Sequence, residues 1–336
     1  MSLESYPPQF RHLVQPQLLE FNSTTGSKST SNSDPIPVID LQHVIEGKEK
    51  EKFEEACKEW GVFRLINHGI PKTFLEKLQD SMDKVFSLPF ETKQGLLTTP
   101  FSYFWGTGRL TKTGEAISRG ADVNLVEGVY TLATQISQFQ PQDHHILTSF
   151  RDLLEEYGKY MHKLATKLFE AMAKNLNLEV ESKSAISEPS GFFRLYRYPS
   201  YSNPEAASGL EPHTDSSTVA ILSENFSSGL QVFKDDQWFT IEHIPNTLIV
   251  NLGDMIKALS NDQYHSVLHK VKVNKYKERY SICYFVFPEE GNVIKSSKYK
   301  PFTYNDFQAQ VQEDIKTVGR KVGLERFKLE DSTNGF

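Results

Sequence analysis

The stretch that decides the fold runs from residue 209 to residue 288, and its centre reads GLQVFKDDQWFTI over residues 229–241. The apolar and aromatic residues on both sides of Asp235-Asp236 are typical of two short strands joined by a tight turn. Residues 247–252 and 279–287 are also rich in β-branched and aromatic side chains, which predicts two more strands. Short strands at this spacing predict a sandwich or jelly roll, and the mouth of such a barrel can hold a binding site.

Four polar signals lie among these predicted strands: His213-Thr214-Asp215, Asn251-Leu252-Gly253-Asp254, His269 and Arg279-Tyr280-Ser281. Side chains two residues apart on a strand point to the same face, so His213 and Asp215 could converge on one metal ion. Two histidines and one carboxylate leave about three metal positions open, as in non-haem Fe(II) oxygenases. Taken alone, the pair favours a surface histidine beside a turn aspartate over a metal site.

The third metal ligand has two candidates, His265 and His269. They share strand parity and would lie about 13 Å apart, so at most one can join the site. Their spacing does not choose between them, and both stay open at this point.

Arg279 and Ser281 again share one strand face. A planar guanidinium beside a hydroxyl is suited to binding a carboxylate. The alternative for Arg279 is a surface salt bridge. That alternative is weakened because Arg279 stands in an otherwise apolar run, where an unpaired charge would be costly.

The rest of the chain predicts supporting structure. Residues 1–34 have few periodic apolar positions and predict a mobile tail, and residues 36–41 predict an edge strand. Helices are expected over 46–60, after Pro71, over 146–172 and over 307–322, with a strand at 62–66. Residues 88–140 are irregular and rich in aromatic residues, which favours a binding loop that presents Phe104 and Trp105.

Composition limits the possible partners. The net charge of −6 argues against a nucleic-acid or anionic-membrane partner. Two cysteines, Cys57 and Cys283, lie in apolar patterns and indicate reduced thiols in a cytoplasmic protein. No apolar run approaches the roughly 18 residues of a membrane-spanning helix.

Taken together, the motifs make the sequence recognisable. It resembles the plant 2-oxoglutarate/Fe(II)-dependent dioxygenases, which include gibberellin oxidases, auxin oxidase, flavonol synthase and anthocyanidin synthase. The resemblance covers about residues 36–325 and includes the runs IPVIDL at 36–41, WGVF at 60–63, NHG at 67–69 and LP at 88–89. It implies an α+β fold, with a distorted double-stranded β-helix (jelly-roll) core and supporting helices.

The same resemblance implies roles for particular residues. The family's iron ligands map to His213, Asp215 and His269, which selects His269 over His265. The family's carboxylate anchor for 2-oxoglutarate maps to Arg279 and Ser281, with Tyr198 as a further contact. Tyr196 stands where many relatives have asparagine. Its hydroxyl could reach the cosubstrate or the side chain could only fill space, and we expect it to fill space.

The implied reaction couples oxidative decarboxylation of 2-oxoglutarate, to succinate and CO2, with oxidation of a small molecule, most often by hydroxylation. The expected cofactor is Fe(II), with 2-oxoglutarate as cosubstrate, O2 as oxidant and ascorbate as a candidate reductant. A hormone such as a gibberellin or an auxin, or a specialised metabolite, is the expected substrate of this monomeric enzyme. A zinc hydrolase with the same ligands and a non-catalytic small-molecule receptor are the alternatives.

The predicted division of the chain follows from these assignments. Residues 1–34 form the tail, 35–185 a support region with the substrate loop, 186–290 the jelly-roll core, and 291–336 a C-terminal helix and tail. The substrate pocket is predicted to be walled by Phe104 and Trp105 from the loop and by Phe285 and Phe287 from the last strand. The two phenylalanines share the parity of Arg279, so they should face the barrel interior.

Overall fold

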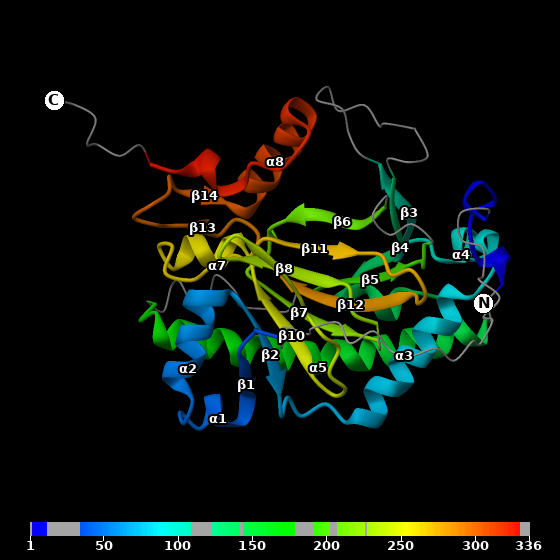
Figure 1. Cartoon of the computed structure of the whole chain (residues 1–336), viewed down its shortest axis with the longest axis horizontal. Helices are drawn as coiled ribbons and strands as arrows, with labels where there is room; N and C mark the ends of the chain where they lie inside the picture. Colours follow the sequence, from blue (N-terminus) through cyan, green and yellow to red (C-terminus); the bar gives the residue numbers. More distant parts are fainter. Residues whose placement is uncertain are drawn as a thin grey trace.

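The computed structural model of the chain describes residues 2–11, 34–108, 123–141, 144–178, 191–201, 207–225 and 227–329. Two β-sheets face each other, and helices cover the outer face of the larger one (Figure 1). This is the predicted α+β arrangement, and the hairpin at Asp235-Asp236 forms as expected because both residues adopt positive φ.

The larger sheet has eight strands in the part of the chain that the structure describes. Their order across the sheet is β1 (Val38–Asp40), β2 (Val62–Ile66), β10 (Leu248–Leu252), β7 (Val219–Glu224), β12 (Arg279–Val286), β5 (Phe192–Tyr198), β4 (Val123–Leu132) and β3 (Ser102–Gly108). The smaller sheet has the order β6 (Ser208–His213), β11 (His269–Lys272), β8 (Leu230–Lys234) and β9 (Gln237–Thr240). All pairings are antiparallel except β1 with β2, which are parallel at the edge predicted for residues 36–41.

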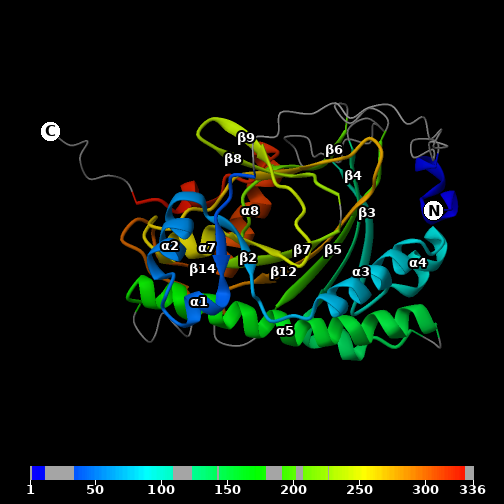
Figure 2. The same ribbon diagram turned by 60° about the horizontal axis from the view of Figure 1, so that its bottom comes forward.

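Two long helices support the larger sheet from outside. Helix α5 (His145–Asn175) and helix α3 (Lys72–Phe86) lie along it, below the strands in Figure 2. Their apolar residues recur at three- and four-residue steps, and this stripe is buried against the sheet. A second apolar cluster lies between the two sheets and includes Tyr196, Tyr198, Leu222 and Val232.

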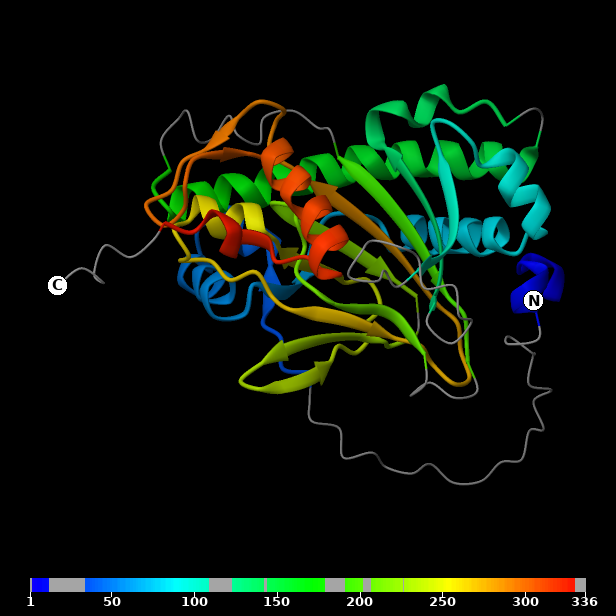
Figure 3. The same ribbon diagram turned by 90° about the horizontal axis from the view of Figure 1, so that it is seen from above.

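The remaining α-helices and strands of the described residues are short, apart from α8. They are α1 (Leu41–Ile45), α2 (Lys50–Glu55), α4 (Phe90–Leu96), α7 (Asp254–Leu259), α8 (Tyr304–Val318) and the pair β13 (Val293–Ile294) and β14 (Phe302–Thr303), which form a small sheet of their own. Short helices of other types lie at Leu3–Ser5, Pro8–Phe10, Ala56–Trp60, Ala133–Gln138 and Gly323–Phe327. Helix α8, orange-red in Figure 3, contributes one wall of the cavity described below. Gly61 has φ of +64° and ends the helical segment before β2, as expected from its position. No helix among the described residues is long and apolar enough to cross a membrane.

Two expectations need correction. The described parts of residues 88–140, which are 88–108 and 123–140, are not irregular: they supply α4, β3 and β4, and the two strands extend the larger sheet. The predicted tail is packed at its start, because Tyr6 is only 3% exposed and its ring contacts Trp105. Strands from both sides of residue 185 share one sheet, and the predicted division of the chain stays a prediction. Residues 12–33 and 109–122 lie outside the described residues.

Candidate metal centre and cosubstrate cavity

Two histidines meet where neighbouring strands of the smaller sheet run side by side. His213 is the last residue of β6 and His269 the first of β11, and the two are directly paired in the antiparallel register. Their ring centroids lie 4.3 Å apart. His265, the other candidate, precedes the strand and is exposed, so it lies outside this pair.

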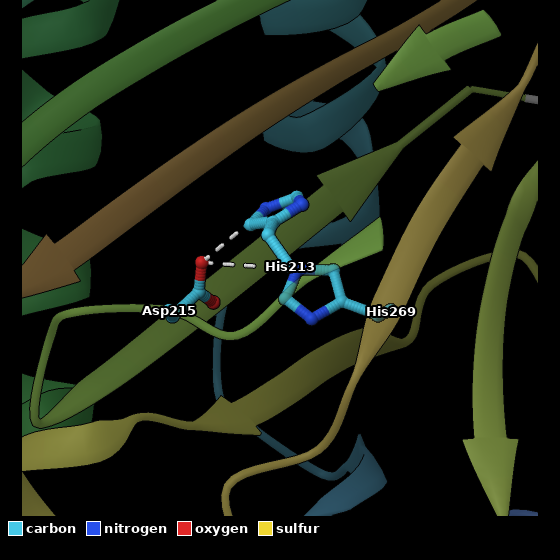
Figure 4. A group of neighbouring side chains, drawn as sticks. All are labelled: His213, Asp215 and His269. Atoms are coloured by element: carbon cyan, nitrogen blue, oxygen red, sulfur yellow. Dashed lines mark ion pairs between the residues drawn. The ribbon is translucent and has the colours of Figure 1, made fainter. Parts of the chain in front are cut away.

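Asp215 completes the group from the loop after β6 (Figure 4). Its Oδ1 atom lies 3.7 Å from Nε2 of His269 and 3.9 Å from Nε2 of His213. One ligand atom from each of the three residues lies within 4.8 Å of the others, which is close enough to hold a metal ion. The predicted shared strand face was wrong in detail, since β6 ends at His213 and it is the loop that turns Asp215 toward the histidines.

Hydrogen bonds orient all three side chains. Nδ1 of His213 lies 2.7 Å from the carbonyl oxygen of Glu211, and Nδ1 of His269 lies 3.1 Å from that of Val267. A carbonyl oxygen only accepts, so Nδ1 carries the proton and Nε2 keeps its lone pair for a metal. Asn251 Nδ2 donates to Oδ2 of Asp215 at 2.7 Å. The other carboxylate oxygen, Oδ1, faces the two histidines.

The protonation states suit a divalent cation. Burial and the neighbouring His269 lower the pKa of His213 to about 4, so its imidazole is neutral at pH 7. Burial opposes ionisation of Asp215, but His269, His213 and the Asn251 hydrogen bond outweigh it and hold the pKa of that carboxyl below its ordinary value. A neutral imidazole and a carboxylate are the forms that bind metal, so the residues fit the iron that the resemblance implies.

The cluster lines a cavity of about 690 Å³ between the two sheets. Arg279 and Ser281 of β12 lie at one end of it, with Tyr198 opposite Arg279 in the register of β5 and β12. The Arg279 guanidinium lies 5.2 Å from the centre of the Tyr198 ring, and its Nη1 donates to Ser281 Oγ at 3.4 Å. The three residues predicted to bind 2-oxoglutarate are therefore neighbours.

One partner of Arg279 was not anticipated. Its Nη2 donates to Oε2 of Glu224 at 2.6 Å, while its buried Nε has no hydrogen-bond partner among the residues that the structure describes. Gly229 makes room for the side chain, because a Cβ there would lie 2.9 Å from Cδ of Arg279. Arg279 is therefore held by Glu224 and keeps donors for a further acceptor.

The predicted substrate residues separate into two groups. Phe285 and Phe287 line the cavity together with Tyr304 of α8, whose ring centre lies 4.7 Å from that of Phe287. Trp105 is not among the lining residues and packs on Tyr6 and Phe10 instead. Phe104 reaches the cavity only indirectly, through ring contact with Tyr196 at 6.3 Å.

Sequence reasoning assigned no role to two further lining residues. Asn251 is a lone amide in the apolar strand β10, a signal that could have marked it as a partner of Asp215. Arg194, on β5, donates to the hydroxyl of Tyr196 at 3.5 Å. The hydroxyl of Tyr196 therefore accepts a hydrogen bond from a charged neighbour, and the role of Tyr196 toward the cosubstrate stays a prediction.

Comparison with known proteins is decisive at this point. Residues 189–288 match the family model of the 2OG-Fe(II) oxygenase superfamily, and residues 36–149 match that of the non-haem dioxygenase in morphine synthesis N-terminal region. Gibberellin 2-beta-dioxygenase 8 of Arabidopsis thaliana is 35% identical over 304 residues, which cover 87% of this chain and 86% of the relative. The chain is a 2-oxoglutarate/Fe(II)-dependent oxygenase.

Other members of this oxygenase family are similar over comparable lengths. The flavonol synthase/flavanone 3-hydroxylase of Petunia hybrida is 33% identical, covering 80% of this chain and 82% of the relative. The crystal structure of JOX2 in complex with 2OG, Fe and JA is 27% identical, with a TM-score of 0.72 over 88% of this chain and 89% of that one. The rice dioxygenase for auxin oxidation, at 22% identity and a TM-score of 0.72 over 88% of this chain and all (100%) of the other, shares the fold.

These likenesses confirm the predicted family and double-stranded β-helix fold. They also confirm the predicted class of enzyme, which uses Fe(II) and 2-oxoglutarate.

Proposed function

We propose that His213, Asp215 and His269 hold Fe(II) and that Arg279, Ser281 and Tyr198 hold the distal carboxylate of 2-oxoglutarate. The enzyme would then oxidise a plant hormone or specialised metabolite, most often by hydroxylation, and release succinate and CO2. The observation that carries the proposal is that the metal-binding cluster and the carboxylate-binding group line one cavity.

The protein side chains would divide the work. Bound iron supplies open coordination positions for the 2-oxo acid and O2. Asn251 would keep Asp215 aligned, and the backbone carbonyls at Glu211 and Val267 would keep both histidines in the metal-binding tautomer. Arg279, oriented by Glu224, would fix the cosubstrate so that its 2-oxo end points at the metal centre.

The zinc hydrolase alternative lacks a catalytic residue. Asp215 is the only carboxylate among the described residues that line the cavity, and it already belongs to the metal cluster. A hydrolase would need a second base to activate water. A hormone or specialised metabolite is favoured as substrate by the names of the relatives, which are a gibberellin 2-beta-dioxygenase, a flavonol synthase/flavanone 3-hydroxylase, a jasmonate-induced oxygenase and a dioxygenase for auxin oxidation.

The compartment, the oligomeric state and the macromolecular partners of the enzyme are also proposals. We propose a cytoplasmic monomer without a nucleic-acid or membrane partner. The net charge of −6 and the two unpaired cysteines support this view.

The test is turnover of 2-oxoglutarate by the purified protein with Fe(II) under air, measured as succinate and CO2. His269→Ala should abolish turnover and lower the bound iron measured by atomic spectroscopy, while the exposed control His265→Ala should keep both. Iron binding lost in His265→Ala but kept in His269→Ala would refute the assignment. Mass spectrometry of hormone and metabolite panels, read for a gain of one oxygen, would then identify the substrate.

A further inference from the structure

Asp215, the carboxylate of the metal cluster, lies in a loop, so its position depends on the contacts that hold this loop. The loop covers residues 214–218 and joins β6 to β7 (Figure 4). The start of α7 holds one side of it, because the backbone N–H of Asp254 donates to the carbonyl oxygen of Asp215 at 2.8 Å. A Cβ at Gly253 would lie 2.1 Å from the carbonyl oxygen of Ser217, so the lack of a side chain there permits the close approach. Backbone contacts therefore fix one side of the loop.

The other side of the loop is held by a side chain from the C-terminal part of the chain. Nζ of Lys321 donates to the carbonyl oxygen of Thr214 and to Oγ of Ser216, both at 2.9 Å. The same Nζ forms an ion pair with Oδ2 of Asp254 at 2.6 Å. An ammonium group has three N–H donors, so these three partners use all of them. Lys321 thus holds the residues directly before and directly after the metal ligand Asp215.

Helix α8 and the turn after it place Lys321 at the loop. Gly319 ends the helix with φ of +79°. Asp314, which is fully buried on α8, accepts from the backbone N–H of Val322 at 3.2 Å and from Nε of Arg326 at 2.9 Å. These bonds hold the segment after the helix against α8, so the position of Lys321 follows from the packing of that helix.

The ion pair with Asp254 balances the charge of Lys321. A lysine beside a site for a divalent cation would by itself repel the metal ion. Asp254 is only 4% exposed and supplies the opposite charge, so the pair adds no net charge near the metal cluster. A pair that served stability alone would need only these two side chains. The further bonds to Thr214 and Ser216 connect the pair to the metal loop.

We propose that Lys321 is a positioning residue for the metal centre, which ties α8 to the loop that carries Asp215 and so fixes the direction of this carboxylate. The inference rests on the proposed function, since it takes Asp215, His213 and His269 as the metal ligands. Helix α8 also lines the cavity, with Tyr304 among its residues, so one side chain joins the cavity wall to the metal centre. Without this tie, the loop would have to become ordered when the metal binds, and the affinity for the metal would fall.

Two double variants that leave the net charge unchanged test the proposal. Lys321→Met with Asp254→Asn removes the tie. Its affinity for Mn(II), a stand-in for Fe(II) measured by calorimetry without 2-oxoglutarate, should fall by about tenfold or more, because hydrogen bonds to a charged donor are lost. The control, Arg326→Met with Asp314→Asn, removes the ion pair between α8 and the segment after it. It should bind Mn(II) as the wild type does, since asparagine keeps an acceptor for the backbone N–H of Val322.

A milder variant covers the case in which the first double variant does not fold. Ser216→Ala removes one bond of Lys321 without a change in charge, and the affinity for Mn(II) should fall by about fivefold. Wild-type affinity in the folded double variant would overturn the proposal, and if that variant does not fold, wild-type affinity in Ser216→Ala would do so. Equal losses in both double variants would also overturn it, because they would reflect general loosening of the C-terminal segment. His269→Ala reports separately on the proposed function, which requires that this variant lose Mn(II) binding.

Discussion

The two faces of strand β5 place two arginines in opposite situations. Arg194 faces the cavity and has no carboxylate partner among the described residues. Arg197, three residues later, faces the other side, is fully buried, and binds Glu127 at 3.0 Å and Glu278 at 3.0 Å. Residues an odd number of positions apart point to opposite faces, so the strand sends one arginine to each environment.

On the face of β5 that carries Arg197, charged side chains pair with one another in a buried network. Lys93 also pairs with Glu127 and donates to the carbonyl oxygens of Ser5 and Phe86 at 2.8 Å and 2.7 Å. The ring of Tyr6 lies 4.1 Å from the Arg197 guanidinium. Two positive and two negative side chains thus balance one another, and the start of the chain covers them.

The fold explains a charged side chain when the protein itself supplies its ion-pair and hydrogen-bond partners. A buried ion is costly unless it is paired and hydrogen-bonded, so the fully partnered Arg197 is explained by the fold alone. The accessible Arg194 has no carboxylate partner among the described residues, so its position is not explained in this way. Arg279 combines both features, because it has a protein partner and also faces the cavity.

The largest effect should come from Arg197→Met. Removing one partner leaves Glu127 and Glu278 under-compensated in the interior, which typically costs about 3 to 5 kcal/mol in the free energy of unfolding. Urea denaturation should show this loss. Arg194→Met, on the opposite face, should change the same quantity by less than about 1 kcal/mol. Equal losses in the two variants would remove the distinction between the faces.

The next effect concerns Arg279→Lys. Lysine keeps the charge that faces Glu224 but lacks the planar group, so 2-oxoglutarate should bind about tenfold more weakly or worse. The KM for 2-oxoglutarate measures this change. Arg194→Lys is the control, and its KM for 2-oxoglutarate should match that of the wild type. If both variants raised the KM for 2-oxoglutarate to the same degree, the assignment of the cosubstrate to Arg279 and not to Arg194 would be wrong.

The smallest effect is expected for Glu224→Gln, which makes Arg279 resemble Arg194 by removing its counter-ion. The empty enzyme should melt at a lower temperature because a buried guanidinium loses its carboxylate. 2-Oxoglutarate should bind more tightly, by up to about tenfold, since its carboxylate no longer meets a neighbouring negative charge. Thermal shift with and without the cosubstrate measures both changes, and weaker binding in this variant would mean that Glu224 acts chiefly by orienting Arg279.

The local sequence was enough to predict the features that depend on residues close together in the chain. The 3.6-residue period predicted α5, and the Asp235-Asp236 turn predicted the β8–β9 hairpin, because each pattern is satisfied within a few residues. The spacing of His213 and Asp215 allowed one shared site, although a loop brings it about instead of a strand. The iron and 2-oxoglutarate chemistry came from motifs in a fixed order, which identify a family.

Tertiary structure decided what depends on pairing between distant segments. Strand register puts His269 beside His213 and leaves His265 exposed, a choice that spacing could not make. Residues 88–140 were misjudged because strands β3 and β4 take their stability from β5 and not from a local period. The network around Arg197 draws on residues up to 192 positions away. That Arg194 has no acidic partner among the described residues also follows from tertiary packing. No local pattern encodes which charges meet, because that depends on how the sheets fold over one another.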